Sequence, residues 1–352
     1  MAEPAEKKVD KKSQADVMAG RRDRLNIAIE AMSQNRQWQV DDLRFSAGSP
    51  DNKSQWDLQV LAKRQNDPNG PRPCITVNKL PQHENQILNE QRQNRPSIKV
   101  LPVDGWADKE VAEIMNGIVR HIEYNSDADI AYSTAGEGQV RVGEGYIRVL
   151  TDYLDEMSVD EQDILICQVK NPFSVYLDPI GLQRDATGRY CDWGFIIDDI
   201  SESEFKRKYP DADPINWELA GSGNEWKAWF PDSKTVRIAE YFYCEYESAT
   251  ICKYADGSVV RGDDEVAKKR YQMAGIAKIA ERTTKLRKWK WCKMNGQEEL
   301  ESKEWAGKYI PLIRMIGNEW MIDGKLQTSG IVRNAKDAQR MFNYWKSTET
   351  EM

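Results

Sequence analysis

A basic stretch in the last third offers the clearest chemistry in this 352-residue sequence. Residues 282–293 (RTTKLRKWKWCK) carry six positive side chains and no acid. The six are Arg282, Lys285, Arg287, Lys288, Lys290 and Lys293. If residues 286–294 form a strand, Trp289 and Trp291 lie on one face and the lysines beside them on the other. These lysines either contact phosphates or an acidic protein partner, or they belong to a solvated edge strand, where lysine limits aggregation.

Motifs for catalysis are missing from the sequence. The pattern G-x-x-x-x-G-K-[ST] does not occur, so there is no phosphate-binding loop of the ATPase type. The glycines between residues 136 and 145 miss the G-x-G-x-x-G spacing, which favours a turn before a hairpin. There is no G-x-S-x-G elbow, and neither His83 nor His121 lies in a recognisable nucleophile–base setting. We therefore predict no enzyme activity and no catalytic residues.

Metal ligands are equally scarce. The six cysteines contain no C-x-x-C pair and there are only two histidines, whereas a zinc site needs clustered ligands. Asp178, Asp185 and Asp192 recur at intervals of seven, and hard cations favour such oxygen ligands. Their spacing matches no known loop, so solvated turn residues are the simpler interpretation. The sequence predicts free thiols in a reducing compartment, no metal and no cofactor.

Helical and strand-like segments alternate irregularly around these residues. Apolar spacing predicts helices at residues 21–34, 52–66, 75–95, 107–134, 263–281 and 331–347. Alternation predicts strands at residues 97–102, 146–150, 164–169, 193–198, 235–246, 286–294 and 309–316. The most amphipathic helix, 107–134, places Val111, Ile114, Met115, Ile118 and Ile122 at helical spacing. Without βαβ regularity, this mixture predicts an α+β fold.

The composition predicts a soluble chain that is nevertheless rich in tryptophan. The net charge is −7, 30% of residues are charged and the mean hydropathy is −0.73. No apolar run approaches the roughly 20 residues of a membrane span, and the polar residues 1–20 predict a disordered tail. Acidity argues against a sequence-specific DNA reader and is compatible with a surface past which DNA slides. The 12 tryptophans fill either the monomer core or contacts between subunits.

Four segments carry a resemblance to a known family. The longest, at 308–351, contains Ile310–Pro311 before Gly317, then Gly330–Val332–Arg333, then Asp337–Ala338–Gln339–Arg340. The others are TVRIAEYFY within 230–247, NPFSVYLDP from residue 171, and ITVNKLPQHENQILNEQRQNRPSIKVLP at 75–102. Together, and in the family's order, they resemble the portal proteins of short-tailed double-stranded DNA bacteriophages over roughly residues 50–351.

The resemblance implies an architecture and a task. It implies an outer α+β wing at 21–262, a first stem helix at 263–281, a small clip at 282–328 and a second stem helix at 329–352, with the chain ending before tunnel, crown and barrel regions. Such subunits form a dodecameric ring at one capsid vertex. DNA enters through the ring, driven by terminase, and leaves through it on infection. Capsid, scaffolding and tail adaptor proteins are the other implied partners, in the host cytoplasm during assembly and then in the virion.

The same resemblance assigns the candidate site residues. It places the six basic side chains of 282–293 near DNA or the terminase motor, where we expect salt-sensitive contacts. It favours tryptophans at subunit seams, namely Trp226, Trp229, Trp289, Trp291, Trp305 and Trp345. The main alternative is another head–tail connector or adaptor ring subunit. A nuclease or terminase would need clustered carboxylates or a phosphate loop, and the sequence has neither.

Overall fold

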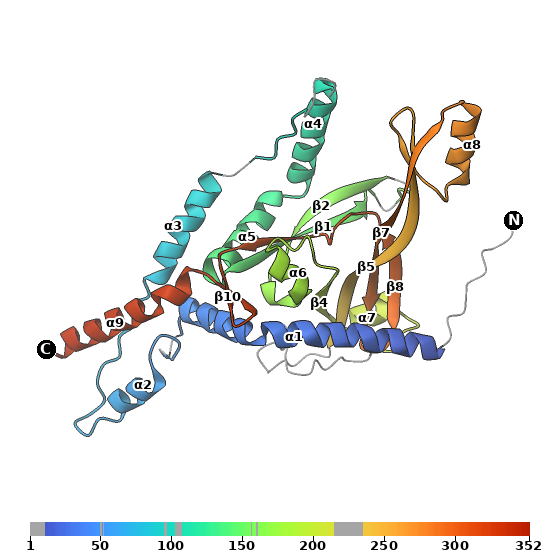
Figure 1. The fold of residues 1–352 in the computed structure, drawn as a ribbon. Coiled ribbons are helices and arrows are strands. Elements are labelled where there is room, and N and C mark those ends of the chain that lie inside the picture. The colour runs from blue at the N-terminus through green and yellow to red at the C-terminus, as the bar shows by residue number, and fades with distance from the viewer. Residues whose placement is uncertain are drawn as a thin grey trace. The chain divides into compact units, whose positions relative to one another are not determined.

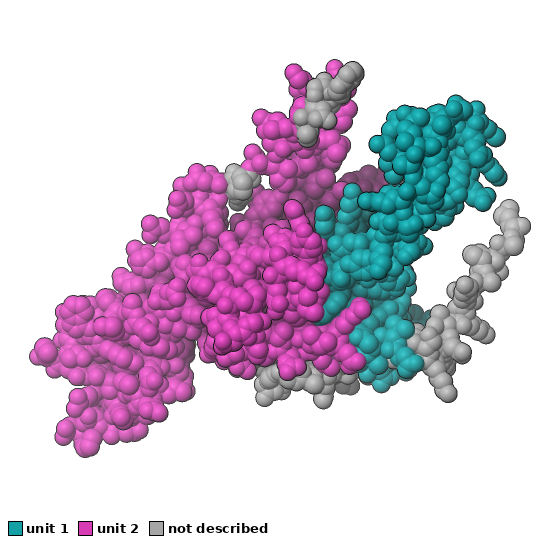
Figure 2. All heavy atoms as spheres, in the orientation of Figure 1, with its two compact units in different colours: residues 1–22, 191–219, 223–310 teal, residues 23–190, 220–222, 311–352 magenta. Residues whose placement is uncertain are grey.

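The computed structural model describes residues 11–49, 51, 53–94, 97–102, 108–155, 157–159, 161–214 and 235–352. The chain divides into two compact units (Figure 2). Unit 1 comprises residues 1–22, 191–219 and 223–310, and unit 2 comprises 23–190, 220–222 and 311–352. Helices and antiparallel sheets occur together, which confirms the predicted α+β class.

Unit 2 combines a small sheet with most of the helices. Its helices are α1 (Lys11–Ala47, from Asp23 onward), α2 (Leu58–Gln65), α3 (Leu80–Gln93), α4 (Lys109–Asn125), α5 (Ala128–Arg141), α6 (Pro179–Arg184) and α9 (Ile331–Glu351). Its sheet has the antiparallel order β2 (Gln162–Gln168), β1 (Glu144–Tyr153), β9 (Leu312–Ile316). The short η1 (Pro172–Ser174), β3 (Val175–Leu177) and the hairpin β10 (Asn318–Ile322) with β11 (Lys325–Ser329) complete it.

Helix α5 packs closely on the sheet of unit 2. Ala131 and Ala135 form a buried apolar cluster with Ile147 of β1. The small helix residues let the backbones approach: a Cβ added at Gly145 would lie 2.0 Å from the carbonyl oxygen of Ala135. Gly145 is therefore required by close contact. The same alanine-rich face explains why a helix forms where we predicted a glycine turn, since Gly136 and Gly138 lie within α5.

A ladder of polar side chains on α9 holds the extended segment 75–79 of unit 2. Gln339, Asn343 and Ser347 lie one helical turn apart and are 5% exposed or less. They accept hydrogen bonds from the backbone N–H groups of residues 79, 77 and 75, at 3.1, 3.1 and 2.9 Å. The Gln339 amide also donates to the Val77 carbonyl. Three side chains thus supply the bonds that a neighbouring strand would supply.

Charged contacts between α9 and α1 accompany the ladder. The Asp42 carboxylate on α1 is fully buried, accepts a hydrogen bond from Arg333 at 3.0 Å and forms an ion pair with Lys336 at 2.6 Å. A buried carboxylate is stable only with such partners. The motif residues of 75–102 and 308–351 therefore meet within one unit and contact each other or α1.

Unit 1 is built on a long antiparallel sheet. Its strands follow the order β4 (Trp193–Ser201), β5 (Thr235–Tyr254), β7 (Lys278–Met294), β8 (Glu299–Trp305), and β6 (Val259–Arg261) pairs with β5. Helix α7 (Glu202–Lys208) covers the apolar cluster of Phe205, Val236 and Ile238. Ser201 caps α7 by accepting from the Glu204 N–H, the usual role of a serine at the N-cap position. Strands β5 and β7 run beyond β4 and β8 as a two-stranded ribbon that ends in α8 (Glu265–Met273) (Figure 1).

The helix predicted at 263–281, the expected first stem helix, is confirmed only over its first half. Helix α8 covers nine residues and strand β7 already begins at Lys278. Gly275 has a φ of +66°, a left-handed conformation that ends helices. Beyond it, the pairing of Lys278 with Tyr254 continues the β5–β7 ladder, so inter-strand hydrogen bonds override the local helical pattern.

Three smaller predictions also need correction. The tail predicted as disordered over 1–20 is helical from Lys11, while residues 1–10 lie outside the described part. The helix predicted at 107–134 is two helices, because Asp127 has a φ of +46° between α4 and α5. Residues 97–102 form no strand: the Val100 N–H and carbonyl bond to the Asn116 amide of α4 instead. The compact units do not follow the expected wing and clip boundaries, and that domain assignment stays a prediction.

The ladder predicts that removal of the Asn343 amide lowers the stability of the fold strongly. Asn343→Ala removes the acceptor of the Val77 N–H and the donor to Gln55 Oε1, leaving two buried polar groups without partners. Each such loss costs about 1–3 kcal/mol, so the free energy of unfolding should fall by about 2–4 kcal/mol in urea titrations. Met341→Ala on the exposed side of α9 is the matched control and should change it by less than about 0.5 kcal/mol. Equal effects of the two substitutions would contradict the ladder's role.

Candidate functional site

The basic stretch lies on β7, and it passes from the β5–β7 ribbon into the part of the sheet of unit 1 where β7 lies between β5 and β8. Residues 286–294 form a strand, as predicted, and its side chains alternate between faces. Trp289 is only 3% exposed, and the lysines on either side of it point to the other face, toward acids of β5. At Lys290 and Lys293, β7 is paired with β5 on one side and β8 on the other, so the edge-strand interpretation is wrong there. The other four basic residues lie where β7 pairs with β5 alone.

Four of the six basic side chains already have acidic partners. Lys288 pairs with Glu247 at 2.9 Å, Lys290 with Glu245 at 2.7 Å, Arg287 with Asp192 at 2.9 Å and Lys293 with Glu240 at 4.0 Å. The hydrogen bond from Lys290 to Glu245 raises the pKa of that lysine, and the hydrogen bond from Lys288 lowers the pKa of Glu247. The row is therefore a ladder of alternating charge, with little net positive potential of its own.

Arg282 and Lys285 differ from the other four. Both are exposed and lie on the β5–β7 ribbon, opposite Ile251 and Ser248 of β5. Within the part of the chain that the structure describes, neither forms an ion pair. Their charges remain available to an external anion.

The candidate interface tryptophans occupy different surroundings. Trp226 and Trp229 lie outside the described residues. Trp289 fills the core of its own sheet, so the expectation that it contacts a neighbouring subunit is corrected by its burial. Trp291 and Trp305 are half-buried and donate to Glu240 Oε2 and the Tyr309 carbonyl. Trp345 is 73% exposed on α9 and remains a candidate for a subunit contact.

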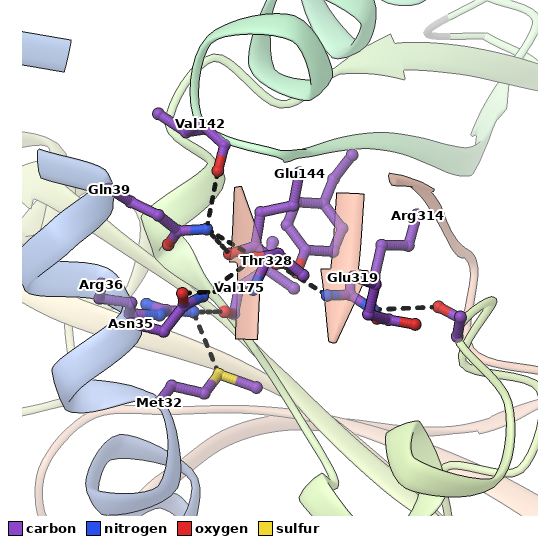
Figure 3. Close-up of polar contacts among 12 residues, drawn as sticks. Met32, Asn35, Arg36, Gln39, Val142, Glu144, Val175, Arg314, Glu319 and Thr328 are labelled. Carbon is purple, nitrogen blue, oxygen red and sulfur yellow. Dashed lines mark hydrogen bonds and ion pairs between the residues drawn. The ribbon is translucent and has the colours of Figure 1, made fainter. Parts of the chain in front are cut away.

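Unit 2 also contains a buried polar cluster that its sequence pattern did not predict (Figure 3). The Glu144 carboxylate accepts from Arg314 at 3.1 Å, and both side chains are at most 7% exposed. Arg314 also contacts Glu319 at 3.0 Å, and the Tyr146 hydroxyl donates to Glu144 at 3.2 Å. Gln39 of α1 donates to the same carboxylate at 3.2 Å. Each charge of the cluster is thus met by an opposite charge or a hydrogen bond.

The cluster joins α1 to the β10–β11 hairpin as well. The Asn35 amide donates to the Thr328 hydroxyl at 2.9 Å and accepts from the Thr328 N–H at 3.2 Å. Arg36 lies 4.1 Å above the ring of Tyr176 and donates to the carbonyl oxygens of Phe173 and Val175. A sequence signal did exist: the buried side of α1 keeps its spacing through Leu25, Ile29 and Met32 into Arg36 and Gln39, although the residues turn polar.

Ionisation of the cluster is set by its charges. Burial raises the pKa of Glu144, but the Arg314 and Arg36 guanidinium groups outweigh it and hold that pKa below its usual range. Burial and the neighbouring Glu144 raise the pKa of Tyr146, so it stays a hydroxyl donor. The cluster therefore carries fixed charges at neutral pH.

No metal centre emerges from the described residues, where no three or more His, Cys, Asp or Glu side chains gather. The three spaced aspartates have local tasks: Asp178 caps α6, Asp185 binds Thr187 and Asp192 pairs with Arg287. In the described part of the chain, no helix is both long and apolar enough to span a bilayer.

Comparison with known proteins identifies the family of this chain. Residues 22–352 match the model of the phage P22-like portal protein. The chain belongs to that family. A curated portal protein of Acyrthosiphon pisum secondary endosymbiont phage 1 is 27% identical over 281 residues, which are 77% of this chain and 38% of that relative. The chain thus spans well under half of the relative's length. The predicted resemblance is confirmed, and portal family membership makes the protein a component of the phage particle.

The buried cluster predicts a pH-dependent stability. Because the folded pKa of Glu144 lies below the unfolded value of about 4.3, its ionisation stabilises the fold above about pH 5 and is lost as the pH falls. Glu144→Gln should lower the free energy of unfolding at pH 7 by about 3 kcal/mol, since it breaks a buried pair. The difference from the unmodified protein should shrink towards pH 4 in urea titrations at stepped pH. Glu90→Gln, at an exposed glutamate, is the control, and a difference independent of pH would refute the assignment.

Proposed function

We propose that this chain is a portal subunit that forms a dodecameric ring at one capsid vertex. In this proposal the terminase large subunit packages double-stranded DNA through the ring, and the DNA leaves through it on infection. The family match across residues 22–352 is the observation that carries the proposal. The absence of catalytic motifs from the sequence supports an assembly role without enzyme activity. Capsid, scaffolding and tail adaptor proteins are the further partners proposed, first in the host cytoplasm and then in the virion.

The proposed contact with DNA or terminase centres on Arg282 and Lys285. Both charges are exposed and unpaired within the described chain, and the ribbon places them beyond β4 and β8. Lys288 and Lys290 would have to exchange Glu247 and Glu245 for a phosphate. Exposed pairs are worth only about 0–1 kcal/mol, so exchange is cheap, but the two glutamates would repel the same phosphate. We therefore assign the salt-sensitive contact first to Arg282 and Lys285.

The proposed ring predicts the mass of the purified assembly. Native mass spectrometry of the purified chain, with negative-stain imaging, should show rings of about a dozen copies with a central hole. Closed rings require contacts between two different surfaces of each copy. A small closed oligomer without a channel would count against the portal ring and favour an adaptor-type assembly.

The two unpaired charges predict a change in salt dependence. Each phosphate contact contributes about −0.9 to the slope of log Kobs against log[salt] on duplex DNA. Arg282→Ala with Lys285→Ala should make the slope of the assembled protein less steep by about 2, measured by fluorescence anisotropy on a short duplex. Lys288→Ala with Lys290→Ala is the matched control and should leave the slope nearly unchanged. The reverse ranking would show that the paired lysines make the contact.

A further inference from the structure

The end of the β5–β7 ribbon carries more cations than its own acids can bind. Residues 248–285 contain eight basic and five acidic side chains, although the chain as a whole has a net charge of −7. Six of the eight cations form no ion pair within the part of the chain that the structure describes, and all but Lys268 of these are exposed. The six are Lys253, Lys268, Lys269, Arg270, Arg282 and Lys285.

The acids of the same segment are mostly occupied already. Four of the five are bound by a group within it: Asp263 by Arg261, Glu281 by Lys278, Asp264 by the Ala267 N–H and Asp256 by Ser258. The hydrogen bond from Lys278 lowers the pKa of Glu281, and the more distant charge of Lys268 adds to this effect. Glu265 is the one acid of the segment without such a bond to a described residue. The ribbon end is therefore positive in its free charges.

These cations lie on both faces of the ribbon. The register places Arg282 opposite Ile251 and Lys285 opposite Ser248. Because side chains alternate along a strand, Arg282 and Lys285 point to opposite faces. Lys253 is two residues from Ile251 and so shares the face of Arg282. An external anion must reach both faces to neutralise them.

Helix α8 adds three consecutive cations to the face of Lys285 (Figure 1). Tyr271 of α8 stacks on Tyr254 of β5 with ring centroids 4.2 Å apart. Lys268 lines a hollow of about 330 Å³ together with Ser248 and Thr250, which share that face. The second face is thus the more strongly charged of the two.

The ribbon also has an open edge. Strand β8 pairs with β7 only from Trp289 onward, so the outer side of residues 278–288 has no strand partner in the described part of the chain. A single sheet layer with its side chains is roughly 10 Å thick, and the major groove of duplex DNA is roughly 12 Å wide. A ribbon that enters this groove edge first turns each face toward one row of phosphates. A flat protein surface would meet only one face.

We propose that the ribbon end enters the major groove of duplex DNA edge first. Lys253 and Arg282 then face one phosphate backbone, while Lys285 and α8 face the other. Thr283, exposed between the two β7 cations, adds a hydroxyl donor of the kind that binds phosphates. Such contacts carry no sequence preference. The proposal rests on the proposed function: it takes DNA as the partner of Arg282 and Lys285 and extends their site to Lys253 and α8.

Two duplexes of equal charge test the groove contact. One is an ordinary 20-base-pair duplex, and the other has the same sequence with glucosylated 5-hydroxymethylcytosine, whose sugars fill the major groove. In fluorescence anisotropy, the assembled protein should bind the glucosylated duplex at least about tenfold more weakly. Equal affinities would overturn the groove contact, because the phosphates of the two duplexes are the same.

A triple variant tests the added cations. Lys253→Ala, Lys269→Ala and Arg270→Ala together should make the slope of log Kobs against log[salt] less steep by about 3 on the ordinary duplex. The matched control replaces three exposed cations of unit 2, namely Lys63, Lys109 and Arg120, by alanine and should leave the slope nearly unchanged. The same loss in both variants would show that only net charge matters and would overturn the site.

The outcomes separate this contact from the ring proposal. Rings that bind both duplexes equally would overturn the groove contact and leave the proposed function intact. Groove-dependent binding by a chain that forms no ring would support the contact and count against the ring. Binding to vesicles of phosphatidylcholine and phosphatidylserine, without binding to either duplex, would assign the cations to lipid headgroups and overturn the groove contact. A chain that neither forms rings nor binds DNA would overturn both.

Discussion

The structure depends most on hydrogen bonds between the side chains of α9 and the backbone of residues 75–79. An extended segment away from any sheet must still satisfy its N–H and carbonyl groups. Gln339, Asn343 and Ser347 do this from one face of one helix, across more than 250 residues of sequence. The interaction fixes both the position of the segment and its register, because each side chain meets one particular peptide group. Helix α3 follows the segment directly, so the same register also fixes where α3 begins.

The same device recurs elsewhere in unit 2. Asn116 satisfies both backbone groups of Val100, and Asn35 bonds to the hydroxyl and N–H of Thr328. Amide side chains suit this task because each offers a donor and an acceptor together. Buried amides and charges are directional, and a shifted arrangement would leave them without partners. Polar matching therefore adds to the apolar clusters of unit 2 in holding it in one arrangement.

These polar contacts explain what the sequence could and could not predict. Periodicity found most helices and strands, since α9, β4 and β9 follow apolar spacing closely. It failed in the second half of 263–281, where strand pairing of Lys278 overrides a helical pattern, and at 97–102, where a helix amide replaces a partner strand. The Glu144–Arg314 cluster was invisible because a polar residue on a helix or strand is normally expected to face water. The basic row was found correctly, but its neutralisation by β5 depends on a register that no local pattern reveals.

The α9 ladder also determines which changes at residues 75–79 the fold can tolerate. Its bonds engage the peptide groups of Ile75, Val77 and Lys79, so the identity of these three side chains matters less than the presence of an N–H group. Proline lacks that group and fixes φ, and is therefore the one residue type excluded at all three positions. On α9, by contrast, the side chains themselves make the hydrogen bonds. Residues 339, 343 and 347 therefore need a particular shape and a particular pattern of donors and acceptors. Related chains should accordingly vary more at residues 75, 77 and 79 than at the polar positions of α9 that bind their peptide groups.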